Sequence, residues 1–135
     1  MNSLEAGFLL LTSRLGDPDR KILTVPQLRT LASRVRAADI SREDRDLTAQ
    51  DLVQLGYNPE FANRIAALLE DTQQLEYYLA RGRRNGCTPV TRAGERYPMA
   101  VRKRLGEDSP GCLWAKGDVA LLQRPAVALV GSRDL

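Results

Sequence analysis

The chain has 135 residues, which is enough for one domain, or for one small domain and the start of another. Its hydrophobic content of 43% and charged content of 27% are typical of a soluble globular protein and argue against a disordered chain. The net charge is only +3, but the chain has three Lys among 20 basic residues, so 17 are Arg. Arg favours bidentate contacts to phosphate or carboxylate, although a genome of high G+C content produces the same bias.

The residue types of the chain exclude the usual zinc sites and the usual general base. The chain has two cysteines, Cys87 and Cys112, and no histidine, so the usual zinc sites and the usual general base are missing. We predict both cysteines to be buried, small apolar residues without a disulfide. We therefore expect no catalytic residues, no metal and no cofactor. The apolar run at 8–11 is too short for a signal peptide or membrane span, which predicts a cytoplasmic protein.

Helix start signals dominate the first 85 residues. Asn2 and Glu5 indicate the beginning of a first helix, and Gly16-Asp17-Pro18 indicates its end. The predicted apolar face of this helix consists of Leu4, Phe8, Leu11 and Leu15.

Two capping boxes follow. Thr24 with Gln27 predicts the start of a second helix, and Thr48 with Asp51 predicts a short third helix that stops at Gly56. The expected hydrophobic-staple pairs are Leu23 with Leu28 and Leu47 with Leu52. The charged stretch between these helices, residues 41–46, is predicted to be a loop.

Two further helices complete the predicted helical region. Asn58 and Pro59 form an N-cap with proline at the first helical position, and Asp71 or Thr72 begins another helix that ends at Gly86. The stripes that we assign to the core, rather than to a ligand site, are Phe61, Ile65, Leu68 and Leu69, then Leu75, Tyr78 and Leu79.

The pattern changes after Gly86. We predict an extended piece, a helix, a strand with a turn, one helical turn and a final strand, at residues 87–90, 97–105, 111–118, 119–122 and 126–130. This order predicts an α+β chain with an all-α domain at 1–85 and the start of an α/β domain at 86–135.

The C-terminal run is the strongest functional signal. Residues 126–130 form a continuous apolar stretch typical of a strand buried on both faces of a parallel sheet. Gly131, Ser132 and Arg133 follow where a phosphate-binding turn would open a helix. We expect the chain to be the N-terminal part of something larger, or a small protein that kept only that part. A lone central strand would fray, pack on the helical domain or pair with a second copy.

Two basic clusters admit a structural and a functional interpretation. They consist of Arg81, Arg83 and Arg84, and of Arg102, Lys103 and Arg104. Either cluster could compensate a helix dipole or contact phosphates. Tyr77 and Tyr78 could stack on bases, although Tyr78 also fits the core stripe. The adjacent acids Glu107 and Asp108 are interpreted as a solvated loop rather than a metal site.

The ordered motifs resemble the N-terminal part of the DNA-processing protein A family (DprA, also called Smf). The series is Tyr97-Pro98, then Pro110 before Leu113-Trp114-Ala115-Lys116-Gly117-Asp118, then Leu121-Leu122 and Val127-Ala128-Leu129-Val130-Gly131-Ser132-Arg133. It spans about residues 70–133. Residues 1–70 resemble the sterile-alpha-motif-like or helix-hairpin-helix-like domain of such proteins more loosely.

The resemblance implies a Rossmann-like domain, here truncated after its first core strand. It implies binding of single-stranded DNA, with Gly131, Ser132 and Arg133 lining the phosphate pocket, and transfer of that DNA to the RecA recombinase in natural transformation. It also implies a homodimer. The later motif that completes the pocket in the family, and most of the dimer and recombinase surfaces, are absent from this chain.

Two other functions stay open. The helical domain could be a protein-interaction module without DNA binding of its own, as its modest charge would allow. The α/β part could also belong to a nucleotide-processing Rossmann-like enzyme, although no catalytic residues are visible.

Overall fold

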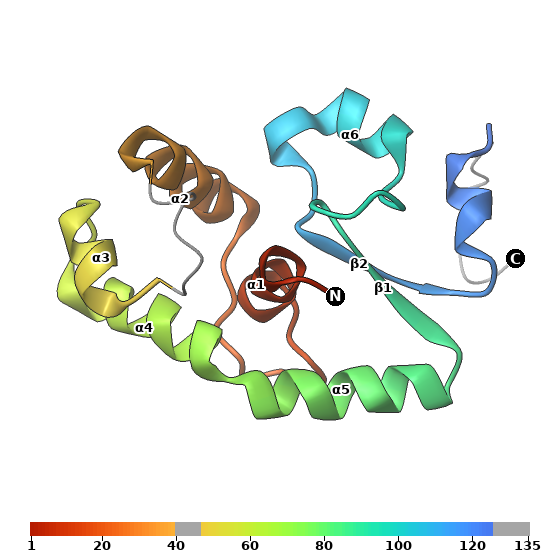
Figure 1. Ribbon diagram of the computed structural model, residues 1–135, viewed down its shortest axis with the longest axis horizontal. Helices are drawn as coiled ribbons and strands as arrows, with labels where there is room; N and C mark the ends of the chain where they lie inside the picture. The colour runs from red at the N-terminus through yellow and green to blue at the C-terminus, as the bar shows by residue number, and fades with distance from the viewer. Residues whose placement is uncertain (40–46, 126–135) are drawn as a thin grey trace, which may run out of the picture.

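A computed structural model describes residues 1–39 and 47–125. Within these ranges the chain forms six α-helices, a two-stranded sheet and short 3-10 turns, arranged as Figure 1 shows. The helices are α1 Ser3–Thr12, α2 Val25–Ala38, α3 Ala49–Gln54, α4 Pro59–Glu70, α5 Thr72–Arg84 and α6 Met99–Leu105. The remaining elements are β1 Cys87–Thr91, β2 Cys112–Lys116 and the 3-10 turns η2 Gly106–Asp108 and η3 Val119–Gln123.

The predicted helix starts are confirmed by their cap hydrogen bonds. Thr24 Oγ1 accepts from the Gln27 amide at 3.3 Å, and the Gln27 side chain accepts from the Thr24 amide at 2.9 Å. The same reciprocal pair joins Thr48 and Asp51 at the start of α3. Asn58 caps α4 through the Phe61 amide at 2.8 Å. These bonds satisfy amides that have no partner inside the helix.

Helix α1 differs from its prediction. It begins at a capping box of Asn2 and Glu5, but it ends at Thr12, so Leu15 lies beyond the helix with a φ of 51°. Leu4, assigned to the apolar face, is 64% exposed. The buried residues are the consecutive Leu9, Leu10 and Leu11. Figure 1 shows the reason, because α1 lies in the middle of the molecule with other elements on several sides.

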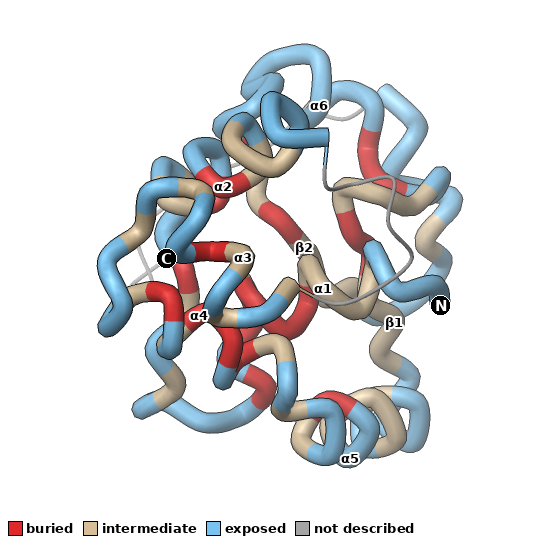
Figure 2. Tube along the Cα trace, turned by 60° about the vertical axis from the view of Figure 1, so that its left-hand side comes forward, coloured by how far each residue is buried: buried red, intermediate tan, exposed pale blue. Residues whose placement is uncertain are grey.

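The helical region has its own hydrophobic core. The helices α1 to α4 meet there, and Figure 2 shows that buried segments concentrate around α1 and between α3 and α4. Leu52, Ala62 and Ile65 have no exposed surface. The other buried members are Leu11, Leu23, Leu31 and Leu68.

The two strands form an antiparallel hairpin that packs on the helices. Val90 pairs with Leu113, and Pro89 pairs with Trp114. Trp114 packs against a second cluster of buried leucines contributed by α1, α5 and the turn between α1 and α2. The strands therefore take their core from the helical region, because a two-stranded hairpin is marginal alone.

The segment between the strands is attached to α2 by charge pairs. Glu107 and Asp108 are exposed, as expected, but they form a 3-10 turn rather than a plain loop. Arg36 Nη2 donates to Glu107 Oε1 at 2.9 Å, and Arg29 forms an ion pair with Asp108. The two acids therefore hold η2 against α2.

The predicted α+β class is confirmed, with a helical region followed by a two-stranded antiparallel sheet. The predicted helix at 97–105 begins two residues late, at Met99, because Pro98 is its extended N-cap residue. The strand expected at 126–130 and the loop expected at 41–46 lie outside the described residues. The domain division at residue 85 stays a prediction. Among the described residues, no helix has the length and apolar character to cross a bilayer.

Candidate nucleic-acid interface

The turn predicted to bind phosphate, Gly131 to Arg133, lies outside the described residues. Its role therefore stays a prediction from the sequence. The auxiliary basic residues are described, and the structure places their two clusters apart. Helix α5 ends at one end of β1 and α6 follows the other (Figure 1), and five strand residues span roughly 16 Å. The two clusters thus do not form one patch.

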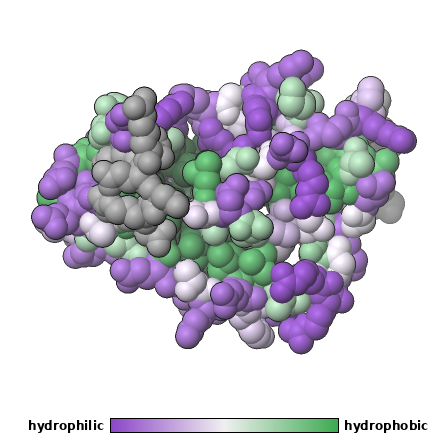
Figure 3. Space-filling model, viewed as in Figure 1, coloured by the Kyte–Doolittle hydropathy of each residue, from purple (hydrophilic) through white to green (hydrophobic). Residues whose placement is uncertain are grey.

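The first cluster ends α5. Arg81, Arg83 and Arg84 are exposed, and within residues 1–39 and 47–125 their side chains form no ion pair. Figure 3 shows hydrophilic side chains gathered at the lower right, where α5 ends. Arg81 and Arg84 lie on one side of the helix, whereas Arg83 lies roughly 200° from Arg81. The positive charge of this cluster is available to an anion.

In the second cluster, one residue of three is already engaged. Arg102 Nη2 donates to the Arg92 carbonyl at 2.6 Å, and its guanidinium lies 5.5 Å from the centre of the Tyr97 ring. Arg102 therefore holds the loop before α6 in place. Lys103 and Arg104 are exposed, and in the described part of the chain they form no ion pair.

Tyr97, from the Tyr-Pro motif, is a structural anchor. Its ring is 1% exposed, and its hydroxyl donates to the Pro110 carbonyl at 2.7 Å. Burial raises the pKa of Tyr97, so the phenol stays protonated as a donor. The motif joins the loop before α6 to the residues that lead into β2.

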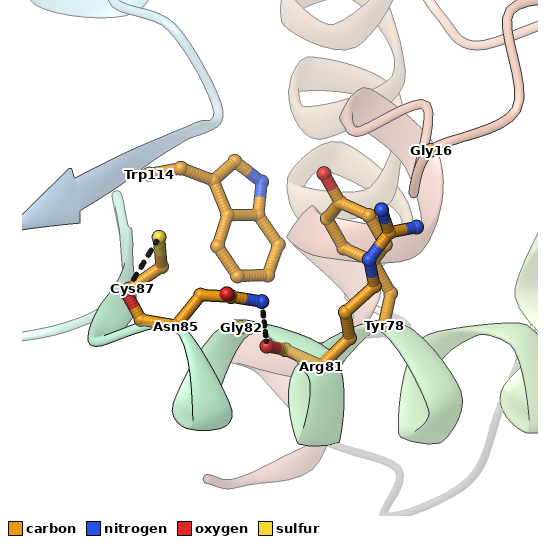
Figure 4. A pocket seen from close by; sticks show the side chains of 7 residues that line it. All are labelled: Gly16, Tyr78, Arg81, Gly82, Asn85, Cys87 and Trp114. Atoms are coloured by element: carbon orange, nitrogen blue, oxygen red, sulfur yellow. Dashed lines mark hydrogen bonds between the residues drawn. The ribbon is translucent and has the colours of Figure 1, made fainter.

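A pocket of about 290 Å³ lies beside the α5 cluster, between α5 and β2. Figure 4 shows the Trp114 indole over α5, with Tyr78 and Arg81 projecting from that helix beside it. The two rings meet edge to face, with centroids 5.1 Å apart. The lining residues are Gly16, Tyr78, Arg81, Gly82, Asn85, Cys87 and Trp114.

Two glycines allow this arrangement. A Cβ on Gly16, whose φ is 80°, would lie 2.8 Å from Tyr78 Cε2. A Cβ on Gly82 would lie 3.4 Å from Trp114 Cζ3, so the indole lies directly on the helix backbone. Trp114 Nε1 donates to Ser13 Oγ at 3.1 Å, which fixes the orientation of the ring. The aromatic wall is therefore held in place before any ligand binds.

The sequence did not single out Trp114 as a site residue. The signal that could have found it is that Trp114 is the only tryptophan of the chain and falls within the short strand predicted at residues 111–118. Tyr77, which was considered for base stacking, is 57% exposed. Tyr78, which was assigned to the core stripe, is half-buried against the core and also lines the pocket.

The cysteines lie at opposite ends of the hairpin, since Cys87 pairs with Lys116 and Cys112 with Thr91. Both are free thiols and half-buried, so the expectation of full burial was wrong. Burial raises the pKa of Cys112, which keeps its thiol protonated and unreactive. Within the described ranges, no group of acids and cysteines could hold a metal ion.

Comparison with known proteins adds one finding. Residues 88–135 match the family model described as DNA recombination-mediator protein A. No curated protein and no solved structure matches the chain. The matched segment contains the Tyr-Pro motif, strand β2 with Trp114 and the Gly-Ser-Arg turn. The resemblance inferred from the motifs is thereby confirmed over residues 88–135, which are similar to the DNA recombination-mediator protein A family.

Proposed function

We propose that the chain is part of a DNA-recombination mediator that binds single-stranded DNA through its C-terminal half. The family match at residues 88–135 is the observation that carries this proposal, since it coincides with the ordered motif series and supports a role in DNA processing. The exposed α5 arginines lie directly before this segment in the chain. Single-stranded DNA suits such a surface because its phosphates bind arginine and its bases remain free to stack.

In this proposal Gly131, Ser132 and Arg133 form the principal phosphate contact. Main-chain amides, a hydroxyl and a guanidinium at one turn suit a phosphate group. Arg81, Arg83 and Arg84 add an auxiliary contact, and Lys103 and Arg104 a weaker one. Arg102 adds little, because its guanidinium already binds main-chain carbonyls.

The family also supports finer proposals about partners. We propose that the protein delivers single-stranded DNA to RecA during DNA uptake, acts in the cytoplasm and works as a homodimer. RecA assembly on single-stranded DNA, followed with and without the chain, tests this role. Faster assembly is expected, and an unchanged rate would contradict the loading role while leaving DNA binding intact.

The DNA-binding proposal is tested by fluorescence anisotropy with a labelled, unstructured oligonucleotide across a salt series. Affinity is expected to fall linearly with salt on logarithmic axes, with a slope of about −0.7 per phosphate contact. Arg133→Ala should reduce that slope by about one contact, whereas Lys21→Ala, an exposed charge before α2, should not. Absence of salt-dependent binding would contradict the proposal and favour a helical interaction module.

A further inference from the structure

The pocket between α5 and β2 combines three features that one kind of ligand uses together. It has a fixed aromatic wall, an arginine without an ion pair among the described residues, and, at its edge, the Asn85 amide, which is held by a hydrogen bond from its Nδ2 to the Arg81 carbonyl at 2.8 Å. We infer that this pocket binds one unpaired nucleobase of a single strand against Trp114, with Arg81 on the adjoining phosphate. The inference rests on the DNA binding proposed above and assigns it a second contact, separate from the Gly-Ser-Arg turn.

The size of the pocket limits the ligand. Pockets that enclose drug-sized molecules begin at about 300 Å³. At about 290 Å³ the pocket suits one ring system but not a dinucleotide. A base within a duplex is already stacked and paired, so only an unpaired base can enter without the cost of extrusion.

The charges around the pocket select an anionic ligand. Arg81 lines the pocket, and Arg84 lies on the same side of α5 one turn further on. Both side chains are exposed, and the pocket has no acidic side chain among its lining residues. A strand whose base lies on the indole would thus extend its phosphates along the end of α5. An acidic peptide would satisfy the arginines but would leave the aromatic wall unused.

Helix α5 has a glycine at the position that the Trp114 indole covers. Gly82 lies inside α5, where glycine costs about 1 kcal/mol relative to alanine. The indole of Trp114 lies over Gly82, so this less favourable helix residue is at the floor of the pocket. A longer side chain at residue 82 would press on the indole and on Cys87, whose carbonyl oxygen lies 3.6 Å from the Cβ position.

The fluorescence of Trp114 reports directly on the site, because it is the only tryptophan in the chain. Titration of the full chain with an unstructured oligonucleotide should quench this fluorescence at the concentrations at which anisotropy reports binding. An abasic strand of the same length should bind through its phosphates without the quenching. A double-stranded oligonucleotide should also leave the fluorescence unchanged.

Two variants locate the contact. Gly82→Leu displaces the indole from the helix while retaining good helix propensity, because a Cβ at residue 82 already lies 3.4 Å from Trp114 Cζ3. It should weaken binding roughly 5- to 100-fold and abolish the quenching. Arg81→Ala should weaken binding roughly twofold to fivefold at low salt and leave the wall intact. Lys21→Ala, which removes the same charge elsewhere, should change neither signal. Circular dichroism establishes that each variant is folded.

The outcomes separate this inference from the proposal on which it rests. Salt-dependent binding without a change in Trp114 fluorescence, or equal quenching by the abasic strand, would overturn the base site and leave the DNA-binding proposal standing. Binding of an acidic peptide with equal quenching would also overturn it. Absence of DNA binding would overturn both. Quenching of Trp114 fluorescence by the unstructured oligonucleotide, together with loss of that quenching in Gly82→Leu, would support the inference.

Discussion

The helical region and the segment after Gly86 are stabilised by different interactions. Among residues 1–39 and 47–125, thirteen of the 15 buried hydrophobic residues precede Gly86, and the other two are Val90 and Tyr97. With few buried apolar side chains, the later segment depends on side-chain bonds to main-chain carbonyls, such as those of Arg102 and Gln123. The helical region has such bonds as well, for example from Arg64, in addition to its apolar core. Figure 2 shows the same contrast, since α6 is largely exposed.

This difference shows how residues 88–125, the described part of the segment that matches the family model, are attached to the helices. Its hairpin contacts α1 and α5 through both strands, and Trp114 and Cys112 pack on the leucine cluster of those helices. The surface that builds the candidate pocket is therefore the same surface that attaches the hairpin to the helices. Changes to the helical core and to the hairpin contact should have separable effects on stability.

The largest effect is expected in the helical core. Leu52→Ala removes a side chain with no exposed surface and should lower the free energy of unfolding by about 2–5 kcal/mol. Leu4→Ala, at a residue 64% exposed, should change it by less than about 0.5 kcal/mol. Urea unfolding followed by circular dichroism measures both. Similar losses in the two variants would contradict the assignment of this core.

The contact between the hairpin and α1 should give an intermediate effect. A Cβ on Gly111 would lie 2.7 Å from Thr12 Cγ2, so Gly111→Ala should cost about 1–3 kcal/mol. Gly7→Ala, where a Cβ inside α1 meets nothing within 4 Å, should stabilise the protein by about 0.5–1 kcal/mol. Thermal unfolding distinguishes the signs, and hydrogen exchange should show the loss in β1 and β2. A neutral Gly111→Ala would refute the close contact.

The smallest effect is expected at the exposed charge pairs between α2 and η2. The Arg36 hydrogen bond and charge lower the pKa of Glu107 from its usual 4.5. Because the folded state has the lower pKa, the pair contributes stability above pH 4.5 and loses it as pH falls through the folded value.

Glu107→Gln should therefore flatten the dependence of stability on pH in that acidic range, and added salt should reduce the difference between the variant and the native chain. Glu95→Gln provides the matched control, since in the described part of the chain Glu95 is exposed and has no ion pair. Urea unfolding at neutral and acidic pH measures the effect. An equal change in both variants would show that the ion pair does not contribute.

The residues that the sequence located well are those whose partners are close along the chain. The caps at Thr24, Thr48 and Asn58 need a partner only three residues away, so their spacing is readable. The hairpin strands and the ordered motifs of the family segment were also readable, because turn residues and apolar runs are local patterns.

The sequence was less informative where burial depends on distant elements. The predicted face of α1 was right at Leu11 and Leu15, which are buried, and wrong at Leu4, which is exposed. It also missed Leu9 and Leu10, because helix periodicity assumes one buried side, whereas α1 is surrounded. The pairing of Glu107 with Arg36 joins residues 71 positions apart, and no local pattern encodes it.

The sequence by itself determined the helix starts, the α+β order and the family resemblance of residues 88–135, because these depend on local spacing and ordered motifs. Only the tertiary structure decided which arginines are free, and only it brought Trp114 over Gly82 and beside Tyr78 and Arg81. That juxtaposition depends on how α5 and the hairpin close onto α1. The way these elements pack together depends on contacts between residues distant in sequence, and the periodicity within one element does not predict it.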